Sequence, residues 1–191
     1  MPQGTKLKDK SPRYTHQMST LRLFLDCEFS SLEKPRLLSL GLSDGGQLEF
    51  YIELDVQGDV VRKLKREMSA FVLDTVVPQM GLTGTVVPDE KSAGTTLAAW
   101  LERQPGALEV AYDYHVDFDL LESALKTVGA WNALQDRLVP THVAYLWGDE
   151  SALTQAESSW AESFASQGID RHHALADARA LARAFRAVHG R

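Results

Sequence analysis

A short apolar run, LRLFLDCEF at 21–29, constrains the fold most because its last residues include two carboxylates. Its length and composition are typical of a strand that lies largely buried in a sheet. Side chains alternate across a strand, so Asp26 and Glu28 project from one face. Such a pair is more often a solvated surface pair than a metal site. Its place at the end of a core-like run, where unpaired charge is costly, favours a bound cation.

The segments that follow predict a mixed sheet flanked by helices. Residues 35–43 and 48–54 form two strands joined by the turn Asp44-Gly45-Gly46, so that the first three strands are antiparallel. Two further strands and several amphipathic helices come next. The fold class is therefore α/β with a five-stranded sheet. The expected later strands are 107–112 and 139–147, and the expected helices are 60–77, 95–103, 117–128, 151–164 and about 170–188.

Length and composition limit the class of protein. A chain of 191 residues, of which 44% are hydrophobic, predicts one domain over 18–191, preceded by a flexible basic tail at 1–17. A net charge of −6 argues against a protein that coats long nucleic acid. One cysteine, Cys27, excludes an internal disulfide framework, and no apolar run is long enough to span a bilayer. We expect a cytoplasmic protein with no membrane partner.

Two more carboxylate groups lie at junctions between predicted elements. The first is YDYHVDFDLL at 112–121, and the second is DRHHALADAR at 170–179. Each has an ordinary explanation, because Asp is favoured at helix N-caps and in first turns. Gly168 supplies a turn before the last helix, and Asp170 is a plausible N-cap for it.

Together, in this order, the three segments resemble the DEDDh family of 3′-to-5′ exonucleases, whose fold is RNase H-like. The resemblance covers about 21–185, and FLDCEF at 24–29 matches the first motif of the family. His-x-Ala-Leu-x-Asp, at 172–177, matches the last and most specific motif. Small bacterial 3′-to-5′ exoribonuclease-like proteins are the most similar branch, on FVLDTVVP at 71–78 and AYD at 111–113.

The resemblance implies a site for two Mg²⁺ or Mn²⁺ ions. Asp26 would bridge both ions, Glu28 and Asp177 would hold the ion nearest the attacking water, and Asp117 would hold the other. His172 would accept the proton of that water. These four carboxylates are the expected metal ligands, and with His172 they are the expected catalytic residues.

The positions of two of these residues stay open on spacing. Asp117 fits the middle motif without a gap, whereas Asp119 needs an insertion and Asp113 lies early in the strand. His173 and Asp177 are four residues apart and would share a helix face, so His172 fits only if it lies in a loop or first turn. We choose Asp117 and His172.

The expected activity is hydrolysis of single-stranded nucleic acid from its 3′ end, with RNA favoured over DNA. Phe29 or Phe118 could stack a base, although most aromatic residues in strands and helices are simply core residues. Arg171 or Arg179 could contact phosphate or lie on a solvated helix face. A homodimer is implied by the resemblance only. The alternatives are an inactive nucleic-acid-binding or regulatory module on the same fold, or another RNase H-like nuclease or phosphodiesterase.

Overall fold

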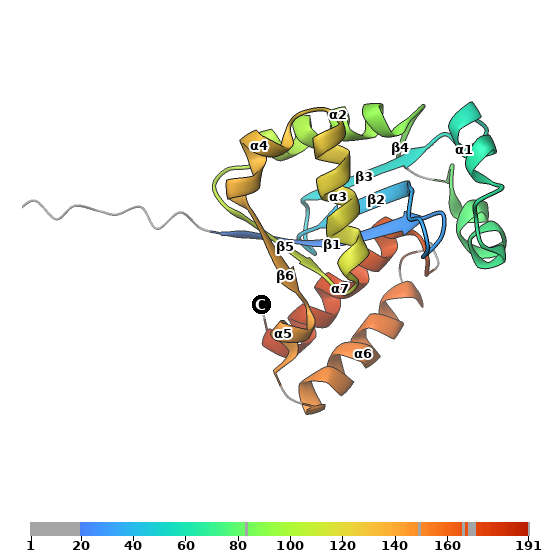
Figure 1. Cartoon of the computed structure of the whole chain (residues 1–191). Coiled ribbons are helices and arrows are strands. Elements are labelled where there is room, and N and C mark those ends of the chain that lie inside the picture. The colour runs from blue at the N-terminus through green and yellow to red at the C-terminus, as the bar shows by residue number, and fades with distance from the viewer. Residues whose placement is uncertain (1–19, 83, 149, 166, 168–170, 191) are drawn as a thin grey trace, which may run out of the picture.

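The computed structural model describes residues 20–82, 84–148, 150–165, 167 and 171–190. A mixed sheet lies between two layers of helices (Figure 1). The predicted tail at 1–17, Gly168 and Asp170 lie outside the described residues. Within the described part, no helix has both the length and the apolar character needed to cross a membrane.

The sheet has the strand order β4-β3-β2-β1-β5-β6. β1, β2 and β3 are antiparallel to one another, as predicted. β4 pairs in parallel with β3, β5 with β1, and β6 with β5. The prediction of five strands was wrong, because the three-residue β4 has too little sequence for a pattern of alternation to show. The strands are β1 (Leu21–Phe29), β2 (Leu37–Ser43), β3 (Glu49–Leu54), β4 (Thr85–Val87), β5 (Leu108–Tyr112) and β6 (Leu138–His142).

The helices divide between the two faces of the sheet (Figure 1). One face packs against α2 (Glu90–Glu102) and α3 (His115–Thr127), with α1 (Asp59–Leu64) and α4 (Trp131–Leu134) at its margins. The other face packs against α7 (Ala174–His189), which α5 (Ala144–Trp147) and α6 (Glu150–Ala165) accompany. Short helical turns complete the chain: η1 (Val72–Val76), η2 (Val77–Gln79) and η3 (Gln135–Arg137).

β1 separates two clusters of side chains. Leu23, Leu25 and Cys27 lie in the main core beneath α2 and α3, whereas Phe24 packs against Leu181 and other residues of α7. Since side chains alternate along a strand, Asp26 and Glu28 share the α7 face with Phe24. Cys27 is therefore a small buried residue on the opposite face of the strand.

Three predicted elements end elsewhere than expected. The helix predicted at 60–77 is split into α1 and η1, and between them the amide of Ser69 donates to the carbonyl of Ser30. The strand predicted at 139–147 ends at His142, because its partner β5 ends there too, and a helical turn follows. The last helix begins at Ala174 rather than near 170, after His172 adopts a φ of 70°.

Gly41 allows α7 to begin directly against the sheet. A Cβ atom at Gly41 would lie 2.6 Å from the backbone of Ala174 and Leu175, which is closer than atoms can approach. Gly41 is paired with Asp26 across β1 and β2. The absence of a side chain therefore places the first turn of α7 beside the carboxylates of β1.

Candidate active site

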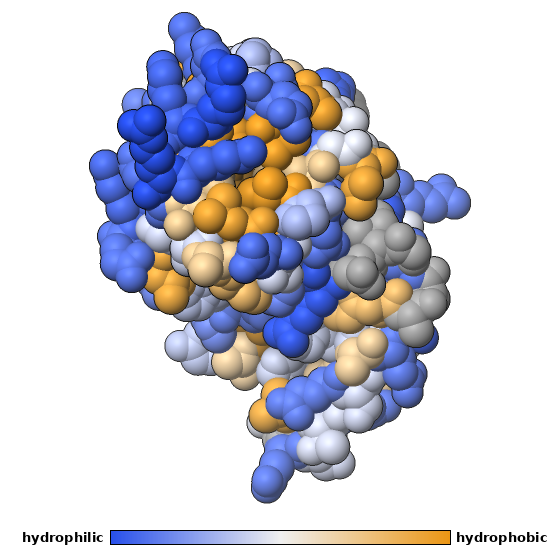
Figure 2. Space-filling model, turned by 90° about the vertical axis from the view of Figure 1, so that its right-hand side faces the viewer, coloured by the Kyte–Doolittle hydropathy of each residue, from blue (hydrophilic) through white to orange (hydrophobic). Residues whose placement is uncertain are grey.

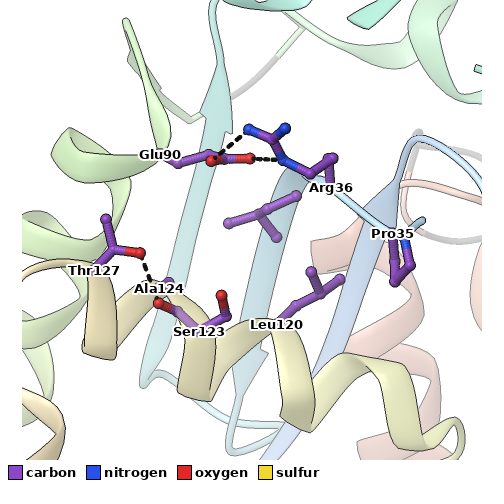
Figure 3. Close-up of a pocket in the computed structure, with 8 residues that line it drawn as sticks. Pro35, Arg36, Glu90, Leu120, Ser123, Ala124 and Thr127 are labelled. Atoms are coloured by element: carbon purple, nitrogen blue, oxygen red, sulfur yellow. Dashed lines mark hydrogen bonds and ion pairs between the residues drawn. The ribbon is translucent and has the colours of Figure 1, made fainter. Parts of the chain in front are cut away.

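Two of the hollows in the surface have a structural explanation or an apolar lining. The one in Figure 3 is about 60 Å³ and is bounded by the Arg36–Glu90 ion pair, in which two bonds measure 2.9 Å. Figure 2 shows apolar side chains gathered in the upper half of another face, and Leu32 (67% exposed) and Phe71 (52% exposed) are large exposed hydrophobic residues. Both line a hollow of about 330 Å³ that reaches Glu28. Each hollow is lined by two ionisable side chains, Arg36 and Glu90 in the first and Glu28 and Glu33 in the second.

A third hollow, which we call the carboxylate pocket, collects the predicted site residues. It lies where β1 and β5 end, a position at which open α/β sheets bind ligands, and has a volume of about 260 Å³. The first turns of α3 and α7 supply the remaining wall. The pocket is lined by Asp26, Cys27, Glu28, Phe29, Phe71, Asp113, Tyr114, Asp117, Trp160, Arg171, His172 and Asp177.

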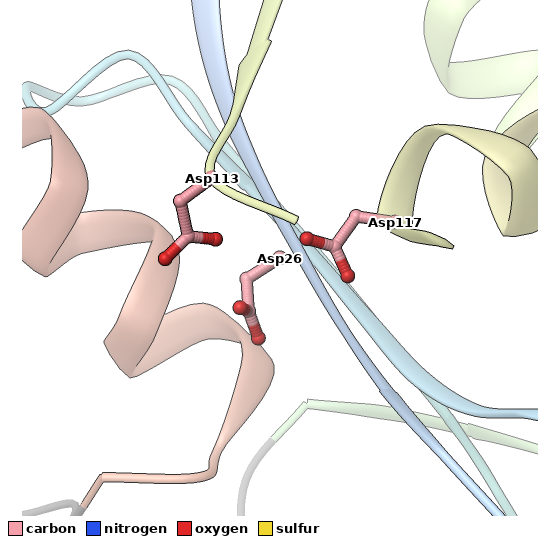
Figure 4. A group of neighbouring side chains, drawn as sticks. All are labelled: Asp26, Asp113 and Asp117. Atoms are coloured by element: carbon pink, nitrogen blue, oxygen red, sulfur yellow. The ribbon is translucent and has the colours of Figure 1, made fainter. Parts of the chain in front are cut away.

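Two groups of carboxylates meet in this pocket and share Asp26. Asp26, Glu28 and Asp177 each offer an oxygen within 4.8 Å of the others, and so do Asp26, Asp113 and Asp117 (Figure 4). Carboxylate oxygens are the ligands that hard divalent cations prefer. The arrangement can hold two cations with Asp26 between them.

The buried oxygens of this cluster fit a cation. Oδ2 of Asp26 and Oδ2 of Asp117 are both buried, and neither has a hydrogen-bond partner. The other oxygen of Asp117 accepts from the amide of Cys27 at 3.3 Å, which fixes the carboxylate beside β1. Asp177 Oδ2 accepts from the amide of His172 at 2.7 Å. Because a buried acceptor without a partner is costly, the two orphaned oxygens are natural ligand atoms.

Burial and mutual repulsion hold the carboxyl pKa values high. Burial, followed by the charges of Asp117 and Asp177, raises the pKa of Asp26 well above its usual value. Burial and Asp177 raise the pKa of Glu28 to about 8. The pKa of Asp117 rises to about 8 through burial and the charge of Asp113, and burial raises that of Asp177 to about 6. These groups ionise together at neutral pH only if positive charge lies between them.

His172 lies at the entrance to α7 and lines the carboxylate pocket. Its left-handed backbone keeps it out of the helix, as the choice of His172 required. The ring of Phe71 meets the imidazole edge-on at 4.8 Å, and the amide of Gln79 donates to the carbonyl of Arg171 at 2.6 Å. Burial and the neighbouring Arg171 lower the pKa of His172, so its neutral form dominates at neutral pH.

His173 points elsewhere and is not among the residues that line the pocket. It is buried and stacks on the ring of Tyr51 at 4.5 Å between centroids. Tyr51 in turn donates to Glu53 at 2.8 Å. His173 therefore belongs to the packing of α7 on the sheet, and of the two histidines His172 is the one that lines the pocket.

The expected substrate contacts divide in the same way. Phe29 lines the pocket, whereas Phe118 is buried in the core. Arg171 lies over the indole of Trp160, with 4.4 Å between its Cζ and the ring centroid, and both line the pocket. Arg179 instead pairs with Glu49 through two bonds of 2.7 Å. Of the four residues considered for substrate contacts, Phe29 and Arg171 line the pocket, whereas Phe118 and Arg179 do not.

Spacing in the sequence favoured Asp117 over Asp113 and gave no sign of Trp160. Asp113 lies beside Asp26 together with Asp117, while Asp119 is exposed and outside both carboxylate groups. Trp160 comes from α6, a weakly amphipathic helix, so no spacing in the sequence connects it to the carboxylates. Comparison of the sequence with models of protein families finds no match, and comparison with curated proteins finds no similar sequence.

Proposed function

We propose that the protein is a metal-dependent 3′-to-5′ exonuclease that hydrolyses single-stranded nucleic acid, with RNA favoured over DNA. The observation that carries the proposal is the pair of carboxylate groups that share Asp26 in one pocket with His172. The strand order, with three antiparallel strands followed by parallel β5 and β6, supports an RNase H-like fold.

The carboxylates would hold Mg²⁺ or Mn²⁺ in two positions. Asp26, Glu28 and Asp177 would bind one ion, and Asp26 with Asp117 and Asp113 the other. Bound ions of this kind lower the pKa of water and stabilise negative charge on a phosphodiester. The orphaned oxygens of Asp26 and Asp117 support this assignment, since a cation would satisfy both.

His172 would act as the general base. Its neutral imidazole takes the proton of the attacking water as the water oxygen bonds to phosphorus. The bond from phosphorus to the 3′ oxygen of the preceding nucleotide breaks, and that oxygen takes a proton from solvent. Asp177 holds the backbone of His172 through its amide, so the base and one metal ligand are positioned together.

Arg171 would contact the substrate phosphate. Stacking on Trp160 orients the guanidinium plane at the pocket, and no ion pair to it occurs among the described residues. Its charge also lies close enough to Asp113 and Asp177 to lower their pKa values against the effect of burial. An exposed guanidinium beside a phosphodiester is a common phosphate contact.

The test is cleavage of 5′-labelled single-stranded RNA and DNA with Mg²⁺ or Mn²⁺, the products being resolved by size. We expect a ladder that shortens from the 3′ end, faster on RNA, and that disappears with chelator and in Asp26→Asn. Asp119→Asn is the matched control, because Asp119 is exposed and outside both groups, and it should keep full activity.

Other results would identify a different protein. Cuts within the oligonucleotide would indicate another RNase H-like nuclease. Hydrolysis of a free nucleoside diester, but not of the oligonucleotides, would indicate a phosphodiesterase. Binding without cleavage, in a protein that metal ions stabilise, would indicate a binding or regulatory module. Either result would contradict the exonuclease.

A further inference from the structure

A hollow beside the carboxylate pocket lies between the end of β6 and the helices α5 and α6, which adjoin in Figure 1. We call it the α5–α6 hollow, and its volume is about 460 Å³. Its walls are mainly apolar, and its polar residues lie at positions 113, 142 and 150. The lining residues are Asp113, His142, Val143, Ala144, Trp147, Gly148, Glu150 and Leu153.

The α5–α6 hollow adjoins the carboxylate pocket. Asp113 lines both, and a smaller space of about 100 Å³ beside them is lined by Asp113, Trp147 and Trp160. Trp160 also lines the carboxylate pocket, where the guanidinium of Arg171 lies over its ring. The two hollows therefore meet at Asp113, and a ligand with its phosphate at the carboxylates would reach the α5–α6 hollow past this residue.

The direction of the proposed reaction decides which part of a substrate takes this path. Displacement at phosphorus is in line, so the leaving 3′ oxygen lies opposite the attacking water. Asp177, which accepts from the amide of His172, belongs to one carboxylate group, and Asp113 and Asp117 belong to the other. The nucleotide that keeps the 3′ oxygen therefore extends toward Asp113.

We infer that the α5–α6 hollow binds the base of the nucleotide next to the 3′-terminal one, an inference that rests on the proposed function. Trp147 offers an indole face, and Leu153 and Val143 offer apolar walls. Bases stack on such side chains with little dependence on sequence. Asp113 and Glu150 place negative charge at the hollow, which opposes a phosphate there and favours an uncharged base.

The test compares two labelled oligonucleotides that differ only in the penultimate nucleotide, which carries its base in one and is abasic in the other. Both keep the same scissile phosphodiester and leaving oxygen. For Trp147→Ala we expect KM to rise roughly tenfold on the base-bearing oligonucleotide with kcat unchanged, and to change little on the abasic one. Wild-type protein should itself prefer the base-bearing oligonucleotide by a similar factor.

A second variant and a binding measurement make the test independent of folding and of turnover. Leu153 is 40% exposed, so Leu153→Trp can fill the hollow without disturbing the core, and it should weaken binding like Trp147→Ala. Fluorescence anisotropy with Asp26→Asn as the background measures binding without cleavage. Trp131→Ala, in α4 and away from the hollow, is the matched control.

The outcomes separate this inference from the proposed function. If both hollow variants keep the base-against-abasic preference of the wild-type protein, the inference is overturned while the exonuclease stands. The same holds if the wild-type protein treats both oligonucleotides alike. If the wild-type protein neither binds nor cleaves either one, the proposed function fails, and the inference fails with it.

Discussion

Replacing Glu28 by Gln tests the electrostatics of the carboxylate cluster without any substrate. The pKa of Glu28 rises from 4.5 to about 8 in the folded chain because the side chain is buried and lies near Asp177 and Asp117. A raised carboxyl pKa means that the folded state binds the proton more tightly than the unfolded state does. Its contribution to stability is therefore complete below pH 4.5 and is lost as the pH rises through about 8.

The magnitude follows from the size of this window. Each pKa unit corresponds to about 1.4 kcal/mol, so ionisable Glu28 lowers the free energy of unfolding by about 3 kcal/mol between pH 4.5 and 7. Glutamine has nearly the same shape and does not ionise. Glu28→Gln should therefore match the wild-type protein at pH 4 and exceed it at pH 7, where Tm rises by roughly 6 to 12 °C.

Thermal and urea unfolding in chelator, followed from pH 4 to pH 8, measure this difference. Glu102→Gln is the matched control, since Glu102 is exposed at the end of α2, away from the carboxylate cluster. Adding Mg²⁺ or Mn²⁺ should stabilise the wild-type protein more than the variant, which has lost a ligand. If the difference in free energy of unfolding between Glu28→Gln and the wild-type protein does not grow as the pH rises, burial and repulsion do not raise the pKa of Glu28 as inferred from the structure.

Three further changes have defined outcomes. His172→Asn keeps a residue type that tolerates the left-handed backbone, and it should lower kcat by about 10²- to 10⁴-fold. If the variant also loses the rise in Tm that metal ions give the wild-type protein, a role in proton transfer is contradicted. Gly41→Ala forces a methyl group into the backbone of α7 and should lower the free energy of unfolding by about 1 to 3 kcal/mol, measured in urea. Asp113→Asn should weaken metal binding in calorimetry while Asp119→Asn does not, and equal effects of the two would remove Asp113 from the site.

The sequence by itself determined the strand that carries Asp26 and Glu28 and the face they share. Alternation along a strand is a local property, so the pattern at 21–29 suffices for both. The last motif likewise brought His172 and Asp177 into one proposal, although their spacing on a regular helix argued against it. The positive φ of His172 resolves that conflict, and in this conformation its amide donates to Asp177.

Tertiary structure decided the features that depend on partners distant in sequence. β4 exists because β3 pairs with it, and β6 ends where β5 ends, although its apolar run continues to 147. Asp113 joins Asp117 beside Asp26 because β5 and α3 meet at the end of β1. Residue spacing within one segment cannot predict this contact between segments far apart in the sequence. Trp160 and the α5–α6 hollow come from the packing of α6 near the sheet edge, which no local pattern in 150–165 predicts.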